Sequence, residues 1–202
     1  MKNANSIITG LARTPIGSFQ GSISNISAVK LGAIVIKEAV KRANLNSDQI
    51  DEVIMGNVLS TGLGQAPARQ ASIYAGLSKF VQCMTINKVC GSGLKAVMLA
   101  DQAIQCNNAE IIVAGGMENM SQSPHYIINS RKGMKLGHQE ITDSMIVDGL
   151  WDPYEKMHMG NCAEVLSKEK AISRKEQDAF AKESYKKSLF AIENNLFKDE
   201  II

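Results

Sequence analysis

Long hydrophobic runs are missing from this sequence of 202 residues. A membrane-spanning helix needs about 18 consecutive apolar residues, and no stretch approaches that length. The amino-terminal stretch MKNANSIITGLARTP also lacks the continuous apolar segment of a secretory signal. We therefore expect a cytoplasmic protein with no membrane partner.

A strong excess of one charge is absent as well. The 22 basic and 20 acidic side chains are intermixed and leave a formal net charge of +2. Binding to nucleic-acid phosphates needs a cluster of basic residues, and the sequence has none. No nucleic-acid partner is expected. The composition, 45% hydrophobic and 21% charged, is typical of a globular protein that buries one or two cores.

Cysteine is scarce, and its spacing excludes two common roles. The four cysteines are Cys83, Cys90, Cys106 and Cys162. None forms a C-x-x-C pair or stands at a metal-ligand spacing from histidine. The sequence therefore predicts four reduced thiols, with neither a metal site nor a disulfide framework.

Alternating strands and helices account for the first half of the chain. Short apolar runs predict strands, and the stretches between them predict helices. The unbroken apolar character of the last run, IIVAGG, is typical of a sheet covered on both faces. An α/β layered fold follows. The expected strands are 6–12, 52–59, 84–89 and 111–116, and the expected helices are 28–43, 66–76 and one that begins after Cys90.

The helix after Cys90 is apolar around its whole circumference. Leu94, Val97, Met98 and Ile104 lie on different sides of it, and charged residues are few. Because such a helix must be buried between two layers, we expect a second layer that these 202 residues do not obviously supply.

The periodic pattern of apolar residues ends between residues 117 and 157, where Met, Ser, Asn and Gly dominate, so a long surface excursion is predicted there. Loops of this length are usually functional. A helix is predicted again where Ser173 and Glu176 match a capping box.

Cys90 is the candidate for chemistry because it stands where a strand ends and a helix begins. The unsatisfied N–H groups of a helix N-terminus favour the thiolate, which is the nucleophilic form. Gly91 and Gly93 remove side chains where a substrate must approach and where a sharp turn can need unusual backbone angles. The backbone N–H of Cys90 would face a developing oxyanion. The alternative is an inert buried thiol, and placement alone leaves both open.

Five ordered segments extend this interpretation. They are GQAPARQAS, NKVCGSGLKAV, VAGGMENMSQSPH, DGLWDPYEKMHMGNCAE and ISRKEQDAFAKES. Together they resemble the thiolase family, specifically its short-chain biosynthetic type, from ARTPIG to the last residue. The resemblance implies a layered thiolase-like core half over residues 1–118, of βαβαβαβ order with a sandwiched helix, and part of a CoA-binding loop domain over residues 119–202.

The resemblance implies covalent catalysis on acetyl-CoA. Cys90 matches the residue that accepts an acetyl group while CoA leaves, and a second acetyl-CoA then attacks to give acetoacetyl-CoA. Thiolysis is the reverse reaction. An activated thiol divides the transfer into two thioester steps. No cofactor is implied, since coenzyme A is a substrate or product, and a role in fatty acid metabolism is expected.

Substrate-binding residues are implied in the loop region. Leu150, His158 and Met159 match positions that lie along the pantetheine of CoA. Two apolar core residues and a surface histidine would give the same pattern, so that alternative stays open.

Supporting and interface residues are implied in the core half. In GGMEN, Glu118 and Asn119 are interpreted as hydrogen-bonding structure beneath the site. Gln65 and Arg69 match positions at which thiolases build their subunit interface, which implies a homo-oligomer. A solvated loop and an arginine on a helix surface would look the same.

The other catalytic residues of the family lie in segments that this sequence does not contain. They are a histidine in G-H-P, an asparagine in N-E-A-F and a second cysteine in C-x-G-G. Without its base a nucleophile loses much of its rate. The expected chain is therefore half of an enzyme completed by a complementary chain, or a truncated product, with an apolar patch that drives association.

Two other functions are alternatives. One is a non-catalytic CoA-binding or assembly subunit. The other is a β-ketoacyl synthase-like condensing enzyme, which shares the layered fold but draws acyl groups from a carrier protein.

Overall fold

The computed structural model describes residues 6–202 and divides the chain into two compact units. The first unit extends to Gly149 and includes Ile202, and the second is Leu150–Ile201. The domain boundary predicted at residue 118 stays a prediction. Along the sequence, the two compact units of the structure meet between Gly149 and Leu150. Within residues 6–202, no helix is both long and apolar enough to cross a membrane.

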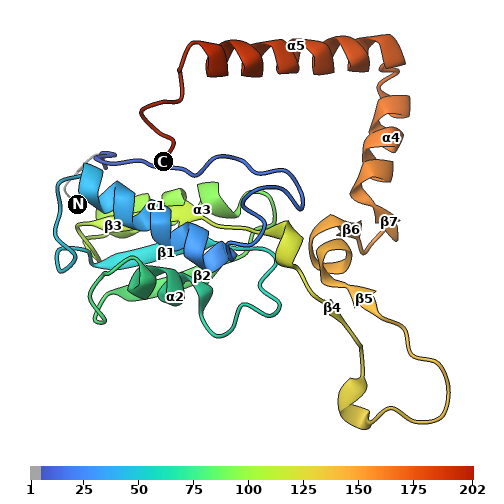
Figure 1. Cartoon of the computed structure of the whole chain (residues 1–202), viewed down its shortest axis with the longest axis horizontal. Coiled ribbons are helices and arrows are strands. Elements are labelled where there is room, and N and C mark those ends of the chain that lie inside the picture. Colours follow the sequence, from blue (N-terminus) through green and yellow to red (C-terminus); the bar gives the residue numbers. More distant parts are fainter. Residues whose placement is uncertain (1–5) are drawn as a thin grey trace. The chain divides into compact units, whose positions relative to one another are not determined.

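The first unit is built on a three-stranded parallel sheet in the order β2-β1-β3 (Figure 1). The strands are β1 (Glu52–Gly56), β2 (Gln82–Ile86) and β3 (Ile112–Gly116). Glu52 lies opposite Gln82 in β2 and Ile112 in β3. Because all three strands run the same way, their carboxyl ends meet at one edge of the sheet. This edge includes the segments after residues 56, 86 and 116.

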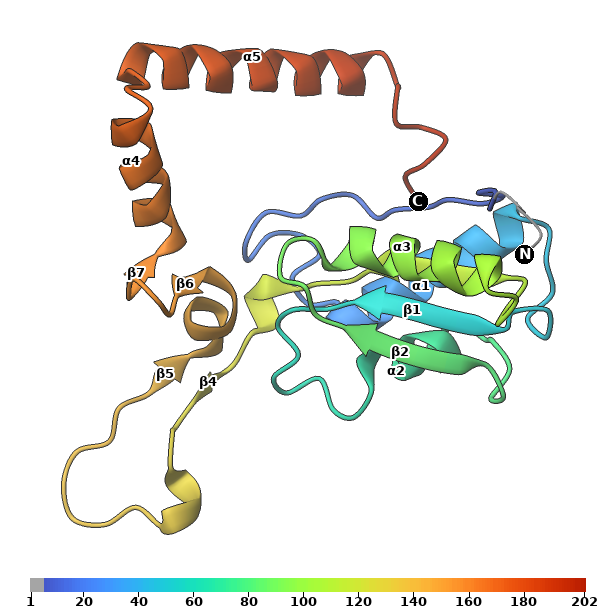
Figure 2. The same cartoon turned by 180° about the vertical axis from the view of Figure 1, so that it is seen from behind.

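Helices cover both faces of this sheet. Figures 1 and 2 show α1 (Ala28–Arg42) and α2 (Pro67–Tyr74) on one side and α3 (Ser92–Gln105) on the other. Successive side chains of a strand alternate between faces, so Val53 and Met55 enter the core shared with α1 and α2, while Ile54 faces α3. The α/β layered fold is confirmed. The core residues are Ala28, Val29, Ala33, Ile36, Val40, Ile50, Val53, Met55, Ala68, Ala71, Ala75, Leu77, Val81 and Met117.

The strand predicted over residues 6–12 does not form. This segment has no ladder partner, and Ile7 and Ile8 are 78% and 79% exposed. An apolar groove of about 620 Å³ lies between it, α1, α3 and β3. A β-strand forms only when its backbone pairs with a neighbouring strand. Here the groove separates residues 6–12 from β3, so this pairing does not occur. Among residues 6–202, the predicted βαβαβαβ order therefore lacks its first strand.

Helix α3 is covered on one face only. Ala96 and Ala100 are buried where α3 packs on β1 and β3. On its other side Leu94 is 70% exposed and Met98 is 48% exposed. The expected second layer is therefore not supplied by residues 6–202.

From Met117 to Leu150 the excursion after β3 contains only short elements, as its composition predicted. They are the 3₁₀ helices η1 (Met120–Gln122) and η2 (Ser130–Lys132), the paired strands β4 (His125–Tyr126) and β5 (Thr142–Asp143), and the π-helical turn η3 (Ile146–Leu150).

The second unit consists of a hairpin and two helices. The hairpin pairs β6 (Trp151–Asp152) with β7 (Met157–His158), and α4 (Met159–Glu169) and α5 (Arg174–Glu193) follow. The capping box of α5 is confirmed, since the backbone N–H of Ser173 donates to Glu176 at 2.7 Å and the Ser173 hydroxyl accepts from the Glu176 N–H at 3.3 Å. Helix α4 was not predicted.

Candidate active site

Cys90 lies at the carboxyl edge of the parallel sheet, in the short connection between β2 and α3. Strand β2 ends at Ile86, and α3 begins at Ser92 with Gly91 as its N-cap. Cys90 is a free cysteine, and the residue is exposed to solvent. The structure therefore places an exposed cysteine directly before a helix N-terminus, at the carboxyl ends of the strands, where α/β proteins usually bind ligands.

The sharp turn before Cys90 depends on Val89, and not on the glycines. Val89 has φ 47°, in the left-handed region that a β-branched residue rarely adopts. Gly91 has φ −89°, and Gly93 is not among the residues with positive φ. The expectation that these two glycines supply unusual angles is wrong. The side-chain oxygen of Asn87 stabilises the turn by accepting the Val89 N–H at 2.9 Å.

Ser92 joins this turn to the helix. Its buried hydroxyl accepts the Lys88 N–H at 2.8 Å and donates to the Val89 carbonyl at 2.6 Å. The first residue of α3 therefore fixes the left-handed residue Val89 and Lys88 before it. Sequence reasoning missed this role. The available signal was a serine at the start of the helix, where short hydroxyl side chains bond to neighbouring backbone.

Gly56 allows the N-terminus of α3 to rest on the sheet. A Cβ atom at Gly56 would lie 2.6 Å from the Ser92 Cβ and 2.8 Å from the Gly93 nitrogen. At Gly116 in β3, an added Cβ would lie 3.5 Å from the Gly93 Cα. The absence of a side chain at Gly56 thus lets the helix approach the end of β1 closely, whereas an added Cβ at Gly116 would make an ordinary contact. Sequence analysis did not single out Gly56.

Glu118 holds the end of β1 from the neighbouring strand. Its carboxylate accepts the Val58 N–H at 2.8 Å, the Leu59 N–H at 3.2 Å and the Asn57 side-chain amide at 2.9 Å. Burial raises the pKa of Glu118 above its ordinary value, and this effect outweighs the three hydrogen bonds, which lower the pKa. The residue has the hydrogen-bonding contacts that its motif predicted.

Asn119 supports a different segment. Its side-chain amide donates to the carbonyls of Ser24 at 2.9 Å and Ile26 at 2.7 Å, and its oxygen accepts the Ser121 N–H at 3.0 Å. These contacts fix the chain where it enters α1, and none of them reaches the turn at Cys90.

Arg69 and Gln65 have contacts within the chain. The Arg69 guanidinium donates to the carbonyls of Lys79 at 3.0 Å and Val81 at 3.3 Å, which ties α2 to the segment before β2. Gln65 is exposed, and its carbonyl accepts from the Gln70 side chain at 2.8 Å. Their position in a subunit interface stays a prediction.

The hairpin of the second unit contains His158 and is flanked by Leu150 and Met159. Trp151 lies opposite His158, Leu150 directly precedes Trp151, and Met159 directly follows His158. His158 is also the N-cap of α4, where its Nδ1 accepts the Gly160 N–H at 3.1 Å. An N-cap role gives this histidine a structural function, and its contact with CoA stays a prediction.

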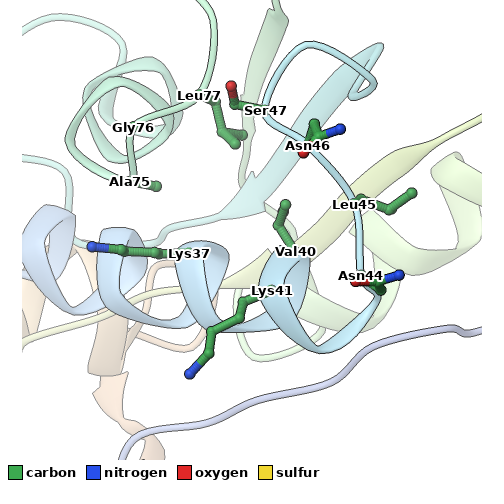
Figure 3. Close-up of a pocket in the computed structure, with 10 residues that line it drawn as sticks. All are labelled: Lys37, Val40, Lys41, Asn44, Leu45, Asn46, Ser47, Ala75, Gly76 and Leu77. Carbon is green, nitrogen blue, oxygen red and sulfur yellow. The ribbon is translucent and has the colours of Figure 1, made fainter.

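A hollow of about 310 Å³ lies at the opposite edge of the sheet (Figure 3). It is lined by the chain segments that follow α1 and α2, including Asn44 and Gly76, and Figure 3 shows Lys37 and Lys41 extending from α1. In α/β units these segments lead into the amino ends of the strands. The hollow therefore has no part in the site around Cys90.

Comparison with known families decides the relationship. Residues 6–202 match the family model described as thiolase, N-terminal domain. The chain belongs to the thiolase family. Among curated thiolases, an acetyl-CoA acetyltransferase of Cupriavidus necator is 54% identical over 97% of this chain and 50% of its own length. One of Pseudomonas aeruginosa is 52% identical over 96% of this chain and 50% of its own length.

A solved thiolase structure has the same fold. The crystal structure of the Acat5 thiolase from Ascaris suum in complex with coenzyme A superimposes with a TM-score of 0.94 at 44% identity. It covers 98% of this chain, whereas this chain covers 52% of that structure. The chain thus spans about half the length of the thiolases it matches.

Proposed function

We propose that this chain accepts an acetyl group from acetyl-CoA on Cys90, the first step of a thiolase reaction. The observation that carries the proposal is the exposed thiol at the start of α3, in a chain that is 54% identical to an acetyl-CoA acetyltransferase. The names of the relatives favour CoA thioesters over carrier-protein substrates, and so disfavour the β-ketoacyl synthase alternative.

The chemical step is an acyl transfer between two sulfur atoms. The thiolate of Cys90 bonds to the carbonyl carbon of acetyl-CoA, and the bond between that carbon and the CoA sulfur breaks. CoA leaves with the electron pair and takes a proton from solvent. The N-terminus of α3 favours the attacking anion, and backbone N–H groups at this turn, that of Cys90 included, would stabilise the oxyanion.

Binding of CoA is assigned in this proposal to the hairpin of the second unit. Leu150 and Met159 flank the paired residues Trp151 and His158 there, and Met159 is 49% exposed. A thioester with a long pantetheine arm needs an apolar surface of this kind. The coenzyme A in the related Ascaris suum thiolase supports CoA as the ligand class.

Condensation to acetoacetyl-CoA, or its reversal by thiolysis, requires residues that lie outside these 202 residues. The chain spans half of its relatives, and the segments G-H-P, N-E-A-F and C-x-G-G are absent from it. A complementary chain with these segments would supply the base and the second cysteine, and Gln65 and Arg69 would contribute to a homo-oligomer. A cytoplasmic location and a role in fatty acid metabolism belong to the same proposal.

A non-catalytic CoA-binding subunit is the second candidate, because the 202 residues include the proposed CoA-binding hairpin but not the segments G-H-P, N-E-A-F and C-x-G-G. Both candidates bind CoA, but only the first forms a covalent acetyl-cysteine. The presence of the adduct therefore decides between them.

Intact-mass spectrometry after incubation with acetyl-CoA tests the proposal. We expect one acetyl adduct that hydroxylamine removes, since it is a thioester. Cys90→Ser should abolish the adduct, and Cys106→Ser, which alters another exposed thiol at the far end of α3, should retain it. If no adduct forms, alone or with a complementary chain, the proposal is wrong and the non-catalytic alternative remains.

A further inference from the structure

The carboxylate of Glu118 faces three N–H donors from the segment that follows β1. Asn57, Val58 and Leu59 each donate to it, at 2.9, 2.8 and 3.2 Å. Asn57 is 2% exposed, so its side-chain amide has little access to water. This amide also donates to the Met117 carbonyl at 3.2 Å, and Glu118 supplies the acceptor for its other contact and for the two backbone N–H groups. Glu118 therefore fixes the position of residues 57–59.

Residues 57–59 in turn fix the end of β2. The Asn57 backbone N–H donates to the Ile86 carbonyl at 3.0 Å, and the Asn87 side-chain amide lies 3.5 Å from the Val58 carbonyl. Asn87 is also the residue whose oxygen accepts the Val89 N–H at 2.9 Å. The contacts are thus continuous from Glu118 to the left-handed residue before Cys90.

We propose that Glu118 is a positioning residue for Cys90, holding segment 57–59 and through it the left-handed turn that places the thiol at the start of α3. The inference rests on the proposed function, in which Cys90 is the nucleophile. Glu118 acts through Asn57, Val58 and Asn87 and does not touch the reacting atoms.

The three donors explain why a carboxylate stands at this position. An ionised carboxylate is an acceptor on both oxygens, so it satisfies several N–H groups at once. Glutamine would keep one oxygen and turn an N–H₂ group towards donors. Alanine would leave all three donors of residues 57–59 without this acceptor.

Thiol alkylation provides the test, because α3 carries an exposed cysteine at each end. Cys90 precedes the helix and Cys106 is its C-cap, so their iodoacetamide rates, measured by peptide mass spectrometry on the full chain, give an internal ratio. We expect Glu118→Ala to lower the Cys90 to Cys106 ratio about two- to fivefold, because the thiol leaves the stabilising helix N-terminus. Glu118→Gln should give a smaller decrease, and Glu140→Ala, which removes an exposed carboxylate from the same excursion, should give none.

Hydrogen exchange at Val58, Leu59 and Val89 is measured on the same variants. Faster exchange at all three positions in Glu118→Gln, together with the lower ratio, supports the proposal even if the alanine variant fails to fold. The proposal is overturned if exchange is faster at Val58 and Leu59 while the exchange rate at Val89 and the Cys90 to Cys106 alkylation ratio are unchanged. Glu118 would then support only the residues that it contacts directly.

The two proposals fail in different ways. If the unaltered chain forms no acetyl adduct, either alone or with a complementary chain, the proposed function is wrong, but the alkylation ratio still reports how Glu118 positions Cys90. If the adduct forms and Glu118→Ala leaves both its rate and the ratio unchanged, the function stands and the positioning role is wrong.

Discussion

Replacing Gly56 with alanine tests whether the N-terminus of α3 depends on close approach to the sheet. The new Cβ atom would lie 2.6 Å from the Ser92 Cβ, 2.7 Å from the Ser92 carbonyl carbon and 2.8 Å from the Gly93 nitrogen. Two of these atoms are backbone, so a side-chain rotation cannot relieve the overlap. The helix must move away from β1 at the point where it follows Cys90.

The expected cost is that of overpacking a core contact, about 1–3 kcal/mol in the free energy of unfolding of the first unit. Mass spectrometry of amide hydrogen exchange measures it, since a tenfold change in the opening equilibrium corresponds to about 1.4 kcal/mol. In Gly56→Ala, the slowest amides of β1 and α3 should exchange about 5- to 150-fold faster than in the unaltered chain.

Gly93→Ala is the matched control, because it adds a methyl group on the helix side of the same contact. Its Cβ would lie 3.8 Å from Gly115, which is ordinary van der Waals distance. Alanine is the better helix former by up to about 1 kcal/mol, so exchange in α3 should be unchanged or slower. Unchanged exchange in Gly56→Ala would refute the reasoning, as would an equal loss in both variants.

Two further changes address the sheet edge and the exposed helix. Asp51 accepts the N–H groups of Glu110 at 2.7 Å and Ile111 at 2.9 Å, and the hydrogen bond from Ile111, then that from Glu110, lowers its pKa below the ordinary 3.8. The stabilisation from these hydrogen bonds is present above pH 3.8 and is lost as the pH falls through the lowered pKa of Asp51. In urea at neutral pH, Asp51→Asn should therefore be less stable than the unaltered chain, and the difference in stability should shrink in acid. A stability difference that does not change with pH would contradict this. Leu94 and Met98 form an exposed apolar stripe on α3, which we expect to drive self-association of the chain. Replacing both residues with glutamine should therefore reduce the self-association measured by light scattering. An unaltered chain that is monomeric would show that the stripe does not drive association.

The order of elements in the first unit could be predicted from local pattern. Ser27 accepts the Lys30 N–H and caps α1, and the apolar runs became β1, β2 and β3 within a few residues of their expected bounds. Such features depend on neighbours in the sequence, so periodicity reveals them. Helix α4 was missed because its N-cap is His158, a residue that capping patterns do not favour.

Pairing and close packing could not be predicted in the same way. Residues 6–12 have the composition of a strand, but a strand needs a neighbour, and no property of the segment itself provides one. The role of Gly56 could not be predicted from its own segment either, because a side chain there is excluded by Ser92, which belongs to α3. The left-handed angle at Val89 also contradicts its local preference.

The sequence by itself determined the candidate nucleophile, the alternation of strands and helices, and the motifs that indicate the thiolase family. These are properties of short stretches, and side-chain chemistry and periodicity are encoded in them directly. Only the tertiary structure showed that Glu118 reaches residues 57–59 and that Gly56 makes room for α3 beside Cys90. The physical reason is that parallel strands bring segments distant in sequence to one edge, where backbone groups from separate strands must satisfy one another.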